Sequence, residues 1–442
     1  MVEALMRSNG RGHDAVGIVA SSPVGFHRFV KEGFVREACQ KKNPRFVDLY
    51  EWMLRNGAGV LIGHTRYSTV GGTAIENAQP FKVQSRFGWI YVAHNGQLVG
   101  HEQYRKELTE AGHTFTSESD SEVLATLITH KKATSLEDAI AQVIQTIPGV
   151  YSLVVIAEDR IIAARDGSGN RPLFTGKMED GGVAVASESG VLYGLADIQE
   201  VPPGAMVTLS QEGGLELVQV LEAPKRAECV LEAIYFARPD RDYNGRPASA
   251  FRQACGKQLA RIYPIQADIV CGVPDSGNYA AFGYAQESGI TYGMGAILKN
   301  MYSGNGRTFT HPGNGRKAIA GNKYTITESL VRGKSVIVVD DSLVRGTTGP
   351  IITEMLFKAG AREVHWVIAS PPVKGRCTYG IDIPKEDQLI SYQRSILQIC
   401  EAIGATSLAY LPLDVMESVA SGYSNGWCTG CFSGNYPIQL TV

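Results

Sequence analysis

Residues 336–348, Val-Ile-Val-Val-Asp-Asp-Ser-Leu-Val-Arg-Gly-Thr-Thr, join an apolar β-branched run to two adjacent carboxylates and a turn of small residues. Asp340 and Asp341 can accept hydrogen bonds from the vicinal hydroxyls of a ribose. The backbone N–H groups of Arg345 to Thr348, which open onto a following helix, can bind its 5′-phosphate. The alternative is an ordinary strand-to-helix turn with two solvated acids, but few turns combine all these features. The stretch therefore predicts a strand, a ribose 5-phosphate site and a helix, in that order.

Length and charge limit what surrounds this site. A chain of 442 residues predicts at least two domains, because single hydrophobic cores stop growing at roughly 250–300 residues. The net charge of −2, from 42 basic and 44 acidic residues, argues against a nucleic-acid partner or an anionic membrane surface. The sequence contains no apolar run of membrane-spanning length and no signal-peptide core at its start. We therefore expect a cytoplasmic protein that acts on small molecules.

The apolar pattern changes near the middle of the chain. Short alternating strands such as 153–157 and 161–164 predict a layered domain of largely antiparallel sheets in the first half. The proline and mixed charges around 221–228 resemble a linker, so we predict domains at 1–222 and 223–442. In the second domain, apolar runs alternate with helical segments, which predicts parallel βαβ units. These pairs are 267–273 with 279–287, and 335–339 with 350–359, followed by a strand at 364–370.

A second anion-binding turn and a basic segment lie in the second domain. Pro274-Asp275-Ser276-Gly277 directly follows one predicted strand and precedes a helix, so its backbone can meet pyrophosphate. Alone, this signal also fits a simple β-turn. The glycine-rich segment 299–323 carries Lys299 and Arg307, which suit an active-site lid over a departing anion. The alternative is that these charges only keep a loop in water.

The 336–348 stretch closely resembles the phosphoribosyl pyrophosphate (PRPP) motif of type I phosphoribosyltransferases. That resemblance implies a parallel-sheet domain that binds PRPP with Mg²⁺. Ser276, Asp340 and Asp341 would face the metal ion. The predicted PRPP-binding residues are Asp275, Ser276, Lys299, Arg307, Asp340, Asp341, Ser342, Arg345, Gly346, Thr347 and Thr348.

The first domain carries four motifs that resemble the glutaminase domain of class II amidotransferases. They are Gly63-His-Thr-Arg-Tyr-Ser-Thr69, Glu76-Asn-Ala-Gln-Pro-Phe81, Ala93-His-Asn-Gly96 and Ser117-Glu-Ser-Asp-Ser-Glu122. The resemblance implies an Ntn-hydrolase-like, four-layer αββα fold. It also implies that Arg66 pairs with the α-carboxylate of glutamine and Asp120 with its α-ammonium. The Asn95 side chain and the Gly96 N–H would form the oxyanion hole, which agrees with the chemistry of these groups. Each residue also has a purely structural reading, as ion pair, hairpin turn or helix cap.

With Tyr235-Phe-Ala-Arg-Pro-Asp240 and the PRPP motif following in order, the whole chain resembles the amidophosphoribosyltransferase family. Members of that family use an N-terminal cysteine as the nucleophile, whereas this chain begins with Met1 and has no cysteine before Cys39. Removal of Met1 would expose Val2, which has no nucleophilic side chain. Two explanations follow: an N-terminal segment is missing, which we favour because the pocket residues remain, or the glutaminase is inactive and free ammonia is used.

Four of the eight cysteines predict a metal centre in the second domain. Cys428-Thr-Gly-Cys431, joined by Cys229 and Cys377, could bind zinc or a 4Fe–4S cluster, and the spacing alone does not decide between them. The family has an iron–sulfur branch, and these four residues resemble its ligands, so we expect the cluster. Uncoordinated thiols are the third possibility. Such a cluster would attach the carboxyl-terminal tail to the start of the second domain.

The resemblance implies a complete reaction. Glutamine is hydrolysed in the first domain, and the ammonia displaces pyrophosphate from Mg²⁺-bound PRPP to give 5-phosphoribosylamine, the first step of purine (IMP) biosynthesis. It also implies purine nucleotide feedback inhibitors and a homo-oligomer. Two alternatives remain: an ammonia-dependent phosphoribosyltransferase with an inactive glutaminase, and a non-catalytic regulator that senses PRPP or nucleotides.

Overall fold

The structure is a computed structural model that describes residues 1–67, 72–210, 214–222, 224–300, 323–383 and 385–437. The chain divides into two compact units between Glu228 and Cys229. Unit 1 also contains Thr378–Asp382 and Pro437, and unit 2 contains the remainder of the chain from Cys229 to Tyr436. The division lies six residues beyond the predicted boundary at 222/223, and the return of Thr378–Asp382 to unit 1 was not predicted.

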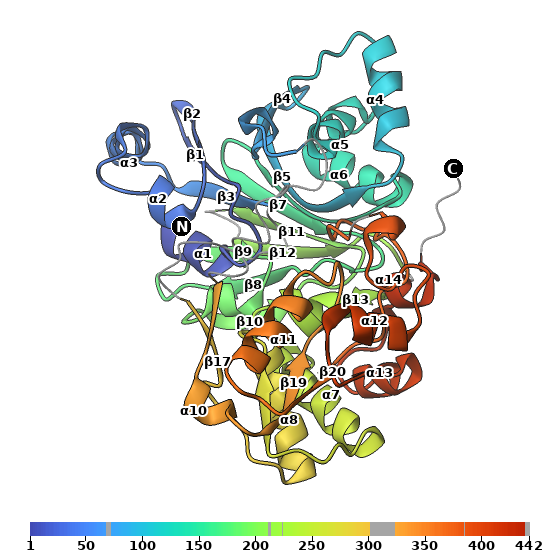
Figure 1. The fold of residues 1–442 in the computed structure, drawn as a ribbon. Helices are drawn as coiled ribbons and strands as arrows, with labels where there is room; N and C mark the ends of the chain where they lie inside the picture. The colour runs from blue at the N-terminus through green and yellow to red at the C-terminus, as the bar shows by residue number, and fades with distance from the viewer. Residues whose placement is uncertain (68–71, 211–213, 223, 301–322, 384, 438–442) are drawn as a thin grey trace. The chain divides into compact units, whose positions relative to one another are not determined.

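Unit 1 contains a small antiparallel sheet of order β10-β8-β9 and two further antiparallel sheets that face each other (Figure 1). The smaller of these two has the order β2-β1-β3, with β1 (Ala15–Ser22) buried at all eight positions because both of its faces are covered. On its outer face β1 packs with Leu49 of helix α3 (Pro44–Asn56), whereas Val19 and Ile62 pack toward the larger sheet. The strands β2 and β3 are Gly25–Glu32 and Val60–Arg66.

The larger sheet has the order β12-β11-β7-β6-β5-β4, and helices cover its other face. Apolar residues at every third or fourth position of α6 (Leu136–Thr146), such as Ile140 and Ile144, pack against this sheet together with the buried helix α5 (Asp120–His130). Helix, sheet, sheet and helix thus form four layers. The strands are β4 Phe81–Ser85, β5 Gly88–Leu98, β6 Gly149–Ile156, β7 Arg160–Arg165, β11 Ala205–Ser210 and β12 Gly214–Gln219.

Unit 2 contains a parallel four-stranded sheet with the order β16-β19-β20-β21. The six positions of β19 (Ser335–Asp340) are all buried, as expected for a central parallel strand with helices on both faces. The outer strands are β16 (Ile269–Gly272), β20 (Glu363–Ile368) and β21 (Ser407–Tyr410). The helices of this unit are α7 Ala248–Ile262, α8 Gly277–Ser288, α10 Glu328–Val331, α11 Thr348–Lys358, α12 Ile396–Ile403, α13 Leu413–Ala420 and α14 Gly430–Ser433.

Shorter elements complete the two units. In unit 1 they are α1 Val2–Ser8, α2 Val35–Ala38, η1 Ile75–Asn77, α4 His101–Glu110, β8 Phe174–Lys177, β9 Val183–Ala186, η2 Ser189–Leu192 and β10 Ala196–Glu200. The others are β13 Glu228–Cys229, η3 Glu232–Phe236, β14 Asp242–Tyr243, β15 Arg246–Pro247, β17 Ile297–Lys299, β18 Tyr324–Ile326, η5 Glu386–Gln388 and β22 Trp427–Cys428.

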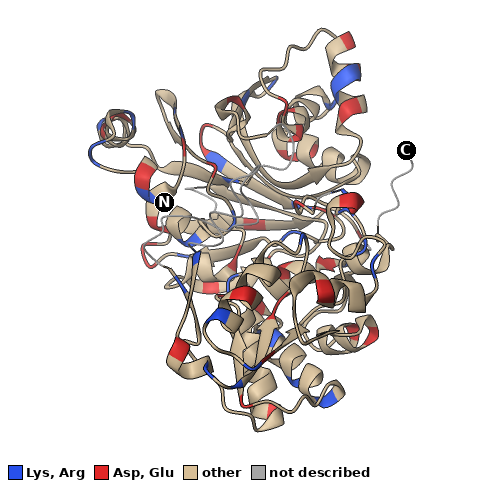
Figure 2. Cartoon of the chain, in the orientation of Figure 1, with Lys and Arg blue, Asp and Glu red and all other residues tan. Residues whose placement is uncertain are grey.

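The fold class predicted from the sequence is confirmed, with antiparallel sheets in unit 1 and a parallel sheet in unit 2. The predicted strand–helix pairs correspond to β16 with α8 and to β19 with α11, with ends that differ by at most two residues. Lys, Arg, Asp and Glu are interspersed along both units (Figure 2). Within the described ranges, no helix has the length and apolar character needed to cross a membrane.

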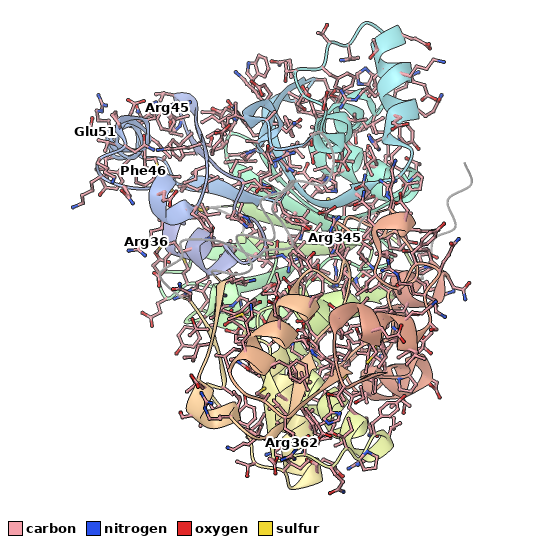
Figure 3. All side chains as sticks on the ribbon, viewed as in Figure 1. Arg36, Arg45, Phe46, Glu51, Arg345 and Arg362 are labelled. Atoms are coloured by element: carbon pink, nitrogen blue, oxygen red, sulfur yellow. The ribbon has the colours of Figure 1, made fainter. Side chains whose placement is uncertain are left out.

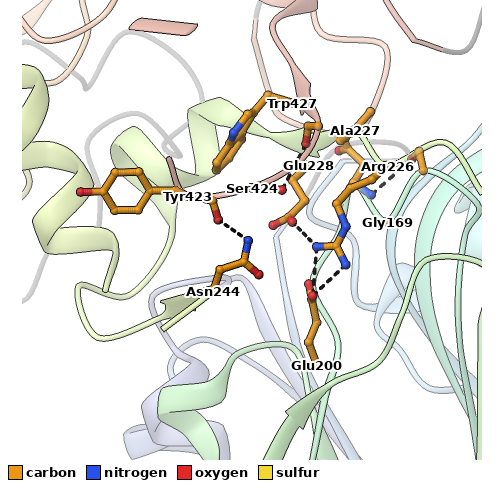
Figure 4. Close-up of polar contacts among 12 residues, drawn as sticks. Gly169, Glu200, Arg226, Ala227, Glu228, Asn244, Tyr423, Ser424 and Trp427 are labelled. Carbon is orange, nitrogen blue, oxygen red and sulfur yellow. Dashed lines mark hydrogen bonds and ion pairs between the residues drawn. The ribbon is translucent and has the colours of Figure 1, made fainter. Parts of the chain in front are cut away.

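The segment predicted to be a linker is fixed to unit 1 by ion pairs. Arg226 contacts Glu200 Oε2 at 2.9 Å through Nη2 and Glu228 Oε1 at 2.6 Å through Nη1 (Figure 4). The Glu228 side chain is almost fully buried. Because two carboxylates share one guanidinium there, the end of unit 1 is held in place, unlike a flexible linker.

Candidate active sites

The predicted ribose-binding acids lie together at the carboxyl end of β19. Asp340 and Asp341 are both buried. Asp341 accepts hydrogen bonds from the Ser276 hydroxyl and, at 2.7 Å, from the Ser342 hydroxyl. The Asp341 N–H donates to Asp340 Oδ1 at 2.9 Å. The two acids are therefore held in fixed orientations at the edge of the sheet where ligands of open α/β folds bind.

Burial disfavours the ionised form of this carboxylate pair. Burial, and then the neighbouring charge of Asp341, raise the pKa of Asp340 well above its ordinary value, while Lys323 acts in the opposite direction. Two adjacent buried carboxylates cannot both ionise at low cost unless cations or hydrogen-bond donors approach them. The site therefore suits a ligand that brings hydroxyl groups and a divalent cation.

The Pro274–Gly277 turn packs against the end of β19, as its position after a parallel strand predicts. A Cβ on Gly277 would lie 2.6 Å from Val339 O and 3.3 Å from the Asp340 Cα, so only glycine allows this approach. Together with the Ser276–Asp341 hydrogen bond, this contact brings the two predicted motifs into one site. The backbone of the turn then lies at the N-terminus of α8, which favours anions.

The predicted phosphate turn lies between β19 and the first residue of α11, and Figure 3 labels its Arg345. Gly346 has φ +70°, and a Cβ there would clash with the Ile390 side chain. Thr347 precedes the helix and makes no capping hydrogen bond through its side chain. Thr348 begins the helix. The first N–H groups of α11 are therefore suited to an anionic ligand. Arg345 Nη1 donates to Gln388 Oε1 at 2.8 Å.

Of the basic residues in the predicted lid segment, the structure describes Lys299 and Lys323. Lys299, the last residue of β17, pairs with Asp275 of the pyrophosphate turn, so the structure brings these two predicted residues together. Arg307 lies outside the described residues. Lys323 is buried and acts electrostatically on Asp340. Lys323 is the last residue of the predicted lid segment and directly precedes β18, and no local pattern in the sequence indicated its burial.

In unit 1, Asn95 and Gly96 lie near the end of β5, which pairs with β6. Gly96 has φ +148°, and a Cβ would clash with Val150 O across the pair, so glycine is required on both grounds. The Asn95 Nδ2 atom is buried and has no hydrogen-bond partner among the described residues. A buried donor without a partner is costly. It is therefore suited to donate to a ligand oxygen.

Arg66 ends β3 and Asp120 begins α5, and both side chains are buried. Arg66 donates to the backbone carbonyl oxygens of Asn77 and, at 2.7 Å, of Gly72. Asp120 Oδ2 accepts the Leu98 N–H at 2.9 Å. Burial lowers the pKa of Arg66, whereas the charges of Asp14 and Asp120 raise it. A guanidinium and a carboxylate thus lie within electrostatic reach, as a zwitterionic amino acid requires.

The four predicted cysteine ligands lie around Cys431 in unit 2. Burial raises the pKa of the Cys431 thiol, and the neighbouring Cys229, Cys377 and Cys428 raise it further. All four also act on the hydroxyl of Tyr436. Among the described residues, however, no three His, Cys, Asp or Glu side chains form a group that could hold a single metal ion. The four thiols are nevertheless neighbours within electrostatic reach of one another.

Two imidazoles beside the unit 1 site stay neutral. Burial, then the charges of Arg66 and His94, lower the pKa of His64 to about 3. Burial also lowers the pKa of His94, against the charge of Asp120. In the unfolded chain both would titrate near pH 6.5.

This difference predicts how acid destabilises the protein. Between about pH 6.5 and 3 the unfolded chain binds a proton at position 64 that the folded chain does not, so the free energy of unfolding decreases as the pH falls. His64→Gln should reduce that slope by about 1.4 kcal/mol per pH unit. Urea unfolding at several pH values measures it. Equal slopes in the wild type and the variant would contradict the burial of a neutral His64.

The chain is similar to known proteins along nearly its whole length. Residues 11–217 match the family model described as "Glutamine amidotransferase domain". A curated amidophosphoribosyltransferase from Archaeoglobus fulgidus is 41% identical, and the alignment covers 86% of this chain and 84% of that protein. The Bacillus subtilis amidophosphoribosyltransferase is 37% identical, and the alignment covers 97% of this chain and 89% of that protein.

Solved structures give the same result. The glutamine PRPP amidotransferase of B. subtilis, complexed with ADP and GMP, has a TM-score of 0.87 at 35% identity and covers 99% of this chain and 94% of its own. A structure described as the allosteric regulatory enzyme of purine biosynthesis has a TM-score of 0.87 at 36% identity. The match covers 99% of this chain and 93% of that chain. The fold, the order of the motifs and these similarities together show that the chain belongs to the amidophosphoribosyltransferase family.

Proposed function

We propose that this chain makes 5-phosphoribosylamine, pyrophosphate and glutamate from PRPP, glutamine and water, the first step of purine biosynthesis. The observation that carries the proposal is the buried Asp340–Asp341 pair at the carboxyl end of β19, followed by the N-terminus of α11. A ribose 5-phosphate presents hydroxyls to the first feature and a phosphate to the second.

In the PRPP half, each described residue has a role that its position supports. Asp340 and Asp341 would accept hydrogen bonds from the ribose hydroxyls. The N–H groups of 345–348 would bind the 5′-phosphate, and the 274–277 turn would face pyrophosphate. Displacement at the anomeric carbon builds positive charge on the sugar and negative charge on the leaving group, so Lys299 and Lys323 would favour departure.

The acids and hydroxyl around Asp341 also fit Mg²⁺. Ser276, Asp340 and Asp341 supply hard oxygen atoms, the ligand type that Mg²⁺ prefers, and burial together with the charge of Asp341 raises the pKa of Asp340. When bound, the ion would neutralise charge on the departing pyrophosphate.

In the glutamine half, Arg66 would bind the α-carboxylate and Asp120 the α-ammonium. The Asn95 amide and the Gly96 N–H would stabilise the oxyanion that forms when the side-chain amide is attacked. Ammonia must then reach PRPP without protonation by bulk water, because ammonium is not a nucleophile. Ammonia supplied from solution would support the same second half-reaction.

The cysteine group suits a 4Fe–4S cluster, as its resemblance to the ligands of the family's iron–sulfur branch implies. Four sulfurs on one tetrahedral zinc would lie about 3.8 Å apart, given a Zn–S distance of about 2.3 Å. A cubane binds each sulfur at a different iron, so its four ligands are neighbours without converging on one point. The thiols around Cys431 act on one another electrostatically, as four ligands of one cluster would. We therefore propose Cys229, Cys377, Cys428 and Cys431 as cluster ligands.

The remaining expectations concern regulation, assembly and location. The B. subtilis relative was solved with ADP and GMP, which supports purine nucleotides as inhibitors of this chain. The homo-oligomer and the cytoplasmic location stay predictions from the sequence.

The reaction is tested by measuring pyrophosphate release from PRPP and Mg²⁺ with ammonium or with glutamine. Ammonium should support release, and Asp341→Asn should lower that rate by about 100-fold because it removes a charge at the reacting sugar. Asp414→Asn, the same change at an exposed position of unit 2, is the matched control. If neither ammonium nor glutamine supports pyrophosphate release, the proposal is overturned. Release with ammonium but not with glutamine would support the ammonia-dependent alternative.

The cluster is tested by visible absorbance and acid-labile sulfide in protein purified without oxygen. We expect broad absorbance and about four sulfides per chain, both lost in Cys431→Ser but kept in Cys400→Ser, whose thiol instead donates to Ala405 O. Bound zinc without sulfide, or absorbance that survives Cys431→Ser, would contradict the assignment.

A further inference from the structure

Each element that carries a predicted glutamine-binding residue of unit 1 also carries a second polar side chain next to it. On β3, His64 lies two positions before Arg66. On β5, His94 directly precedes Asn95, and on α5, Ser121 directly follows Asp120. His94 and Ser121 are almost fully buried, and the His64 Nδ1 atom is buried as well. These side chains are therefore placed to connect the three elements that carry Arg66, Asn95 and Asp120.

Gln79 connects two of these elements through both ends of its side-chain amide. Its Oε1 accepts the backbone N–H of His94 at 2.6 Å, and its Nε2 donates to Ser121 Oγ at 3.0 Å. Gln79 itself is buried, so neither bond competes with bulk water. One side chain thus joins the backbone before Asn95 to the residue after Asp120.

The histidines complete the connection. Ser121 Oγ also contacts His94 Nδ1 at 3.0 Å. The Ser121 hydroxyl can accept from Gln79 and still bond Nδ1 of either neutral tautomer, as donor or as acceptor. His64 lies close enough to His94 that the two rings act on each other electrostatically. The peptide that leads into Asn95 is therefore held by the Gln79 side chain.

From this arrangement we propose that Gln79 is a positioning residue for glutamine. With His64, His94 and Ser121, it sets the placement of the Asn95 oxyanion donor relative to the Asp120 ammonium acceptor. This inference rests on the proposed glutamine site. Gln79 would not contact the substrate. It would act by holding β5 and α5 at the separation that spans a glutamine from its side-chain amide to its α-ammonium group.

The test compares Gln79→Met, which keeps the length of the side chain but no hydrogen bond, with Gln79→Glu, which can bond both His94 and Ser121. We expect the dissociation constant for L-glutamine, from calorimetry, to rise at least tenfold in Gln79→Met and to stay within about threefold in Gln79→Glu. Gln84→Met is the matched control at an exposed position of the next strand. Binding of PRPP in unit 2 should not change in any variant.

A second measurement does not depend on glutamine binding. In protein labelled with ¹⁵N-asparagine, the side-chain amide signals of Asn95, identified by their loss in Asn95→Asp, should shift in Gln79→Met and in Ser121→Ala but not in Gln84→Met. Unchanged Asn95 signals, or unchanged glutamine affinity in Gln79→Met, would overturn the positioning role. If the wild type binds no glutamine, the proposed glutamine site fails, and the Asn95 signals alone decide whether Gln79 positions Asn95.

Discussion

Unit 2 depends on the burial of two adjacent carboxylates at the carboxyl end of a central parallel strand. Asp340 and Asp341 could not stay there without donors, and the neighbouring elements supply them: the Ser276 hydroxyl from the preceding turn and the Ser342 hydroxyl. Gly277 lets that turn approach β19 closely enough to do so. Burial and the neighbouring charge of Asp341 nevertheless raise the pKa of Asp340. A magnesium-bound sugar phosphate would bring a cation and hydroxyl groups to this pair.

Unit 1 follows the same principle with a different ligand. The Asn95 amide is buried without a partner in the described chain, beside a glycine whose backbone no other residue could adopt without a clash. Arg66 and Asp120 provide opposite charges nearby. Neutral histidines keep this region free of further positive charge, since burial lowers the pKa of both His64 and His94. A zwitterion with a polar amide satisfies all these groups at once.

The sequence predicted the parts of each site that are contiguous in the chain. The Asp340–Asp341 turn, the 274–277 turn and the Cys428–Cys431 pair could be recognised because each follows or forms a local element. The role of Gln79 could not be recognised in this way. Its two partners lie 15 and 42 positions away in the chain, and it contacts them only when β5 and α5 are packed. The role of Lys323 depends on its burial, and the return of Thr378–Asp382 to unit 1 depends on packing that no local pattern reports.

The central claim is that each unit holds one substrate by buried charge. Calorimetric titration of Asp120→Asn and Asp341→Asn with L-glutamine and with Mg²⁺-PRPP tests it most directly. Both substitutions keep the shape of the side chain and remove one charge, so a folded variant should lose one ligand. The account predicts that Asp120→Asn binds PRPP normally and glutamine at least tenfold more weakly, and that Asp341→Asn does the reverse. Loss of both ligands in either variant, or of neither, would contradict it.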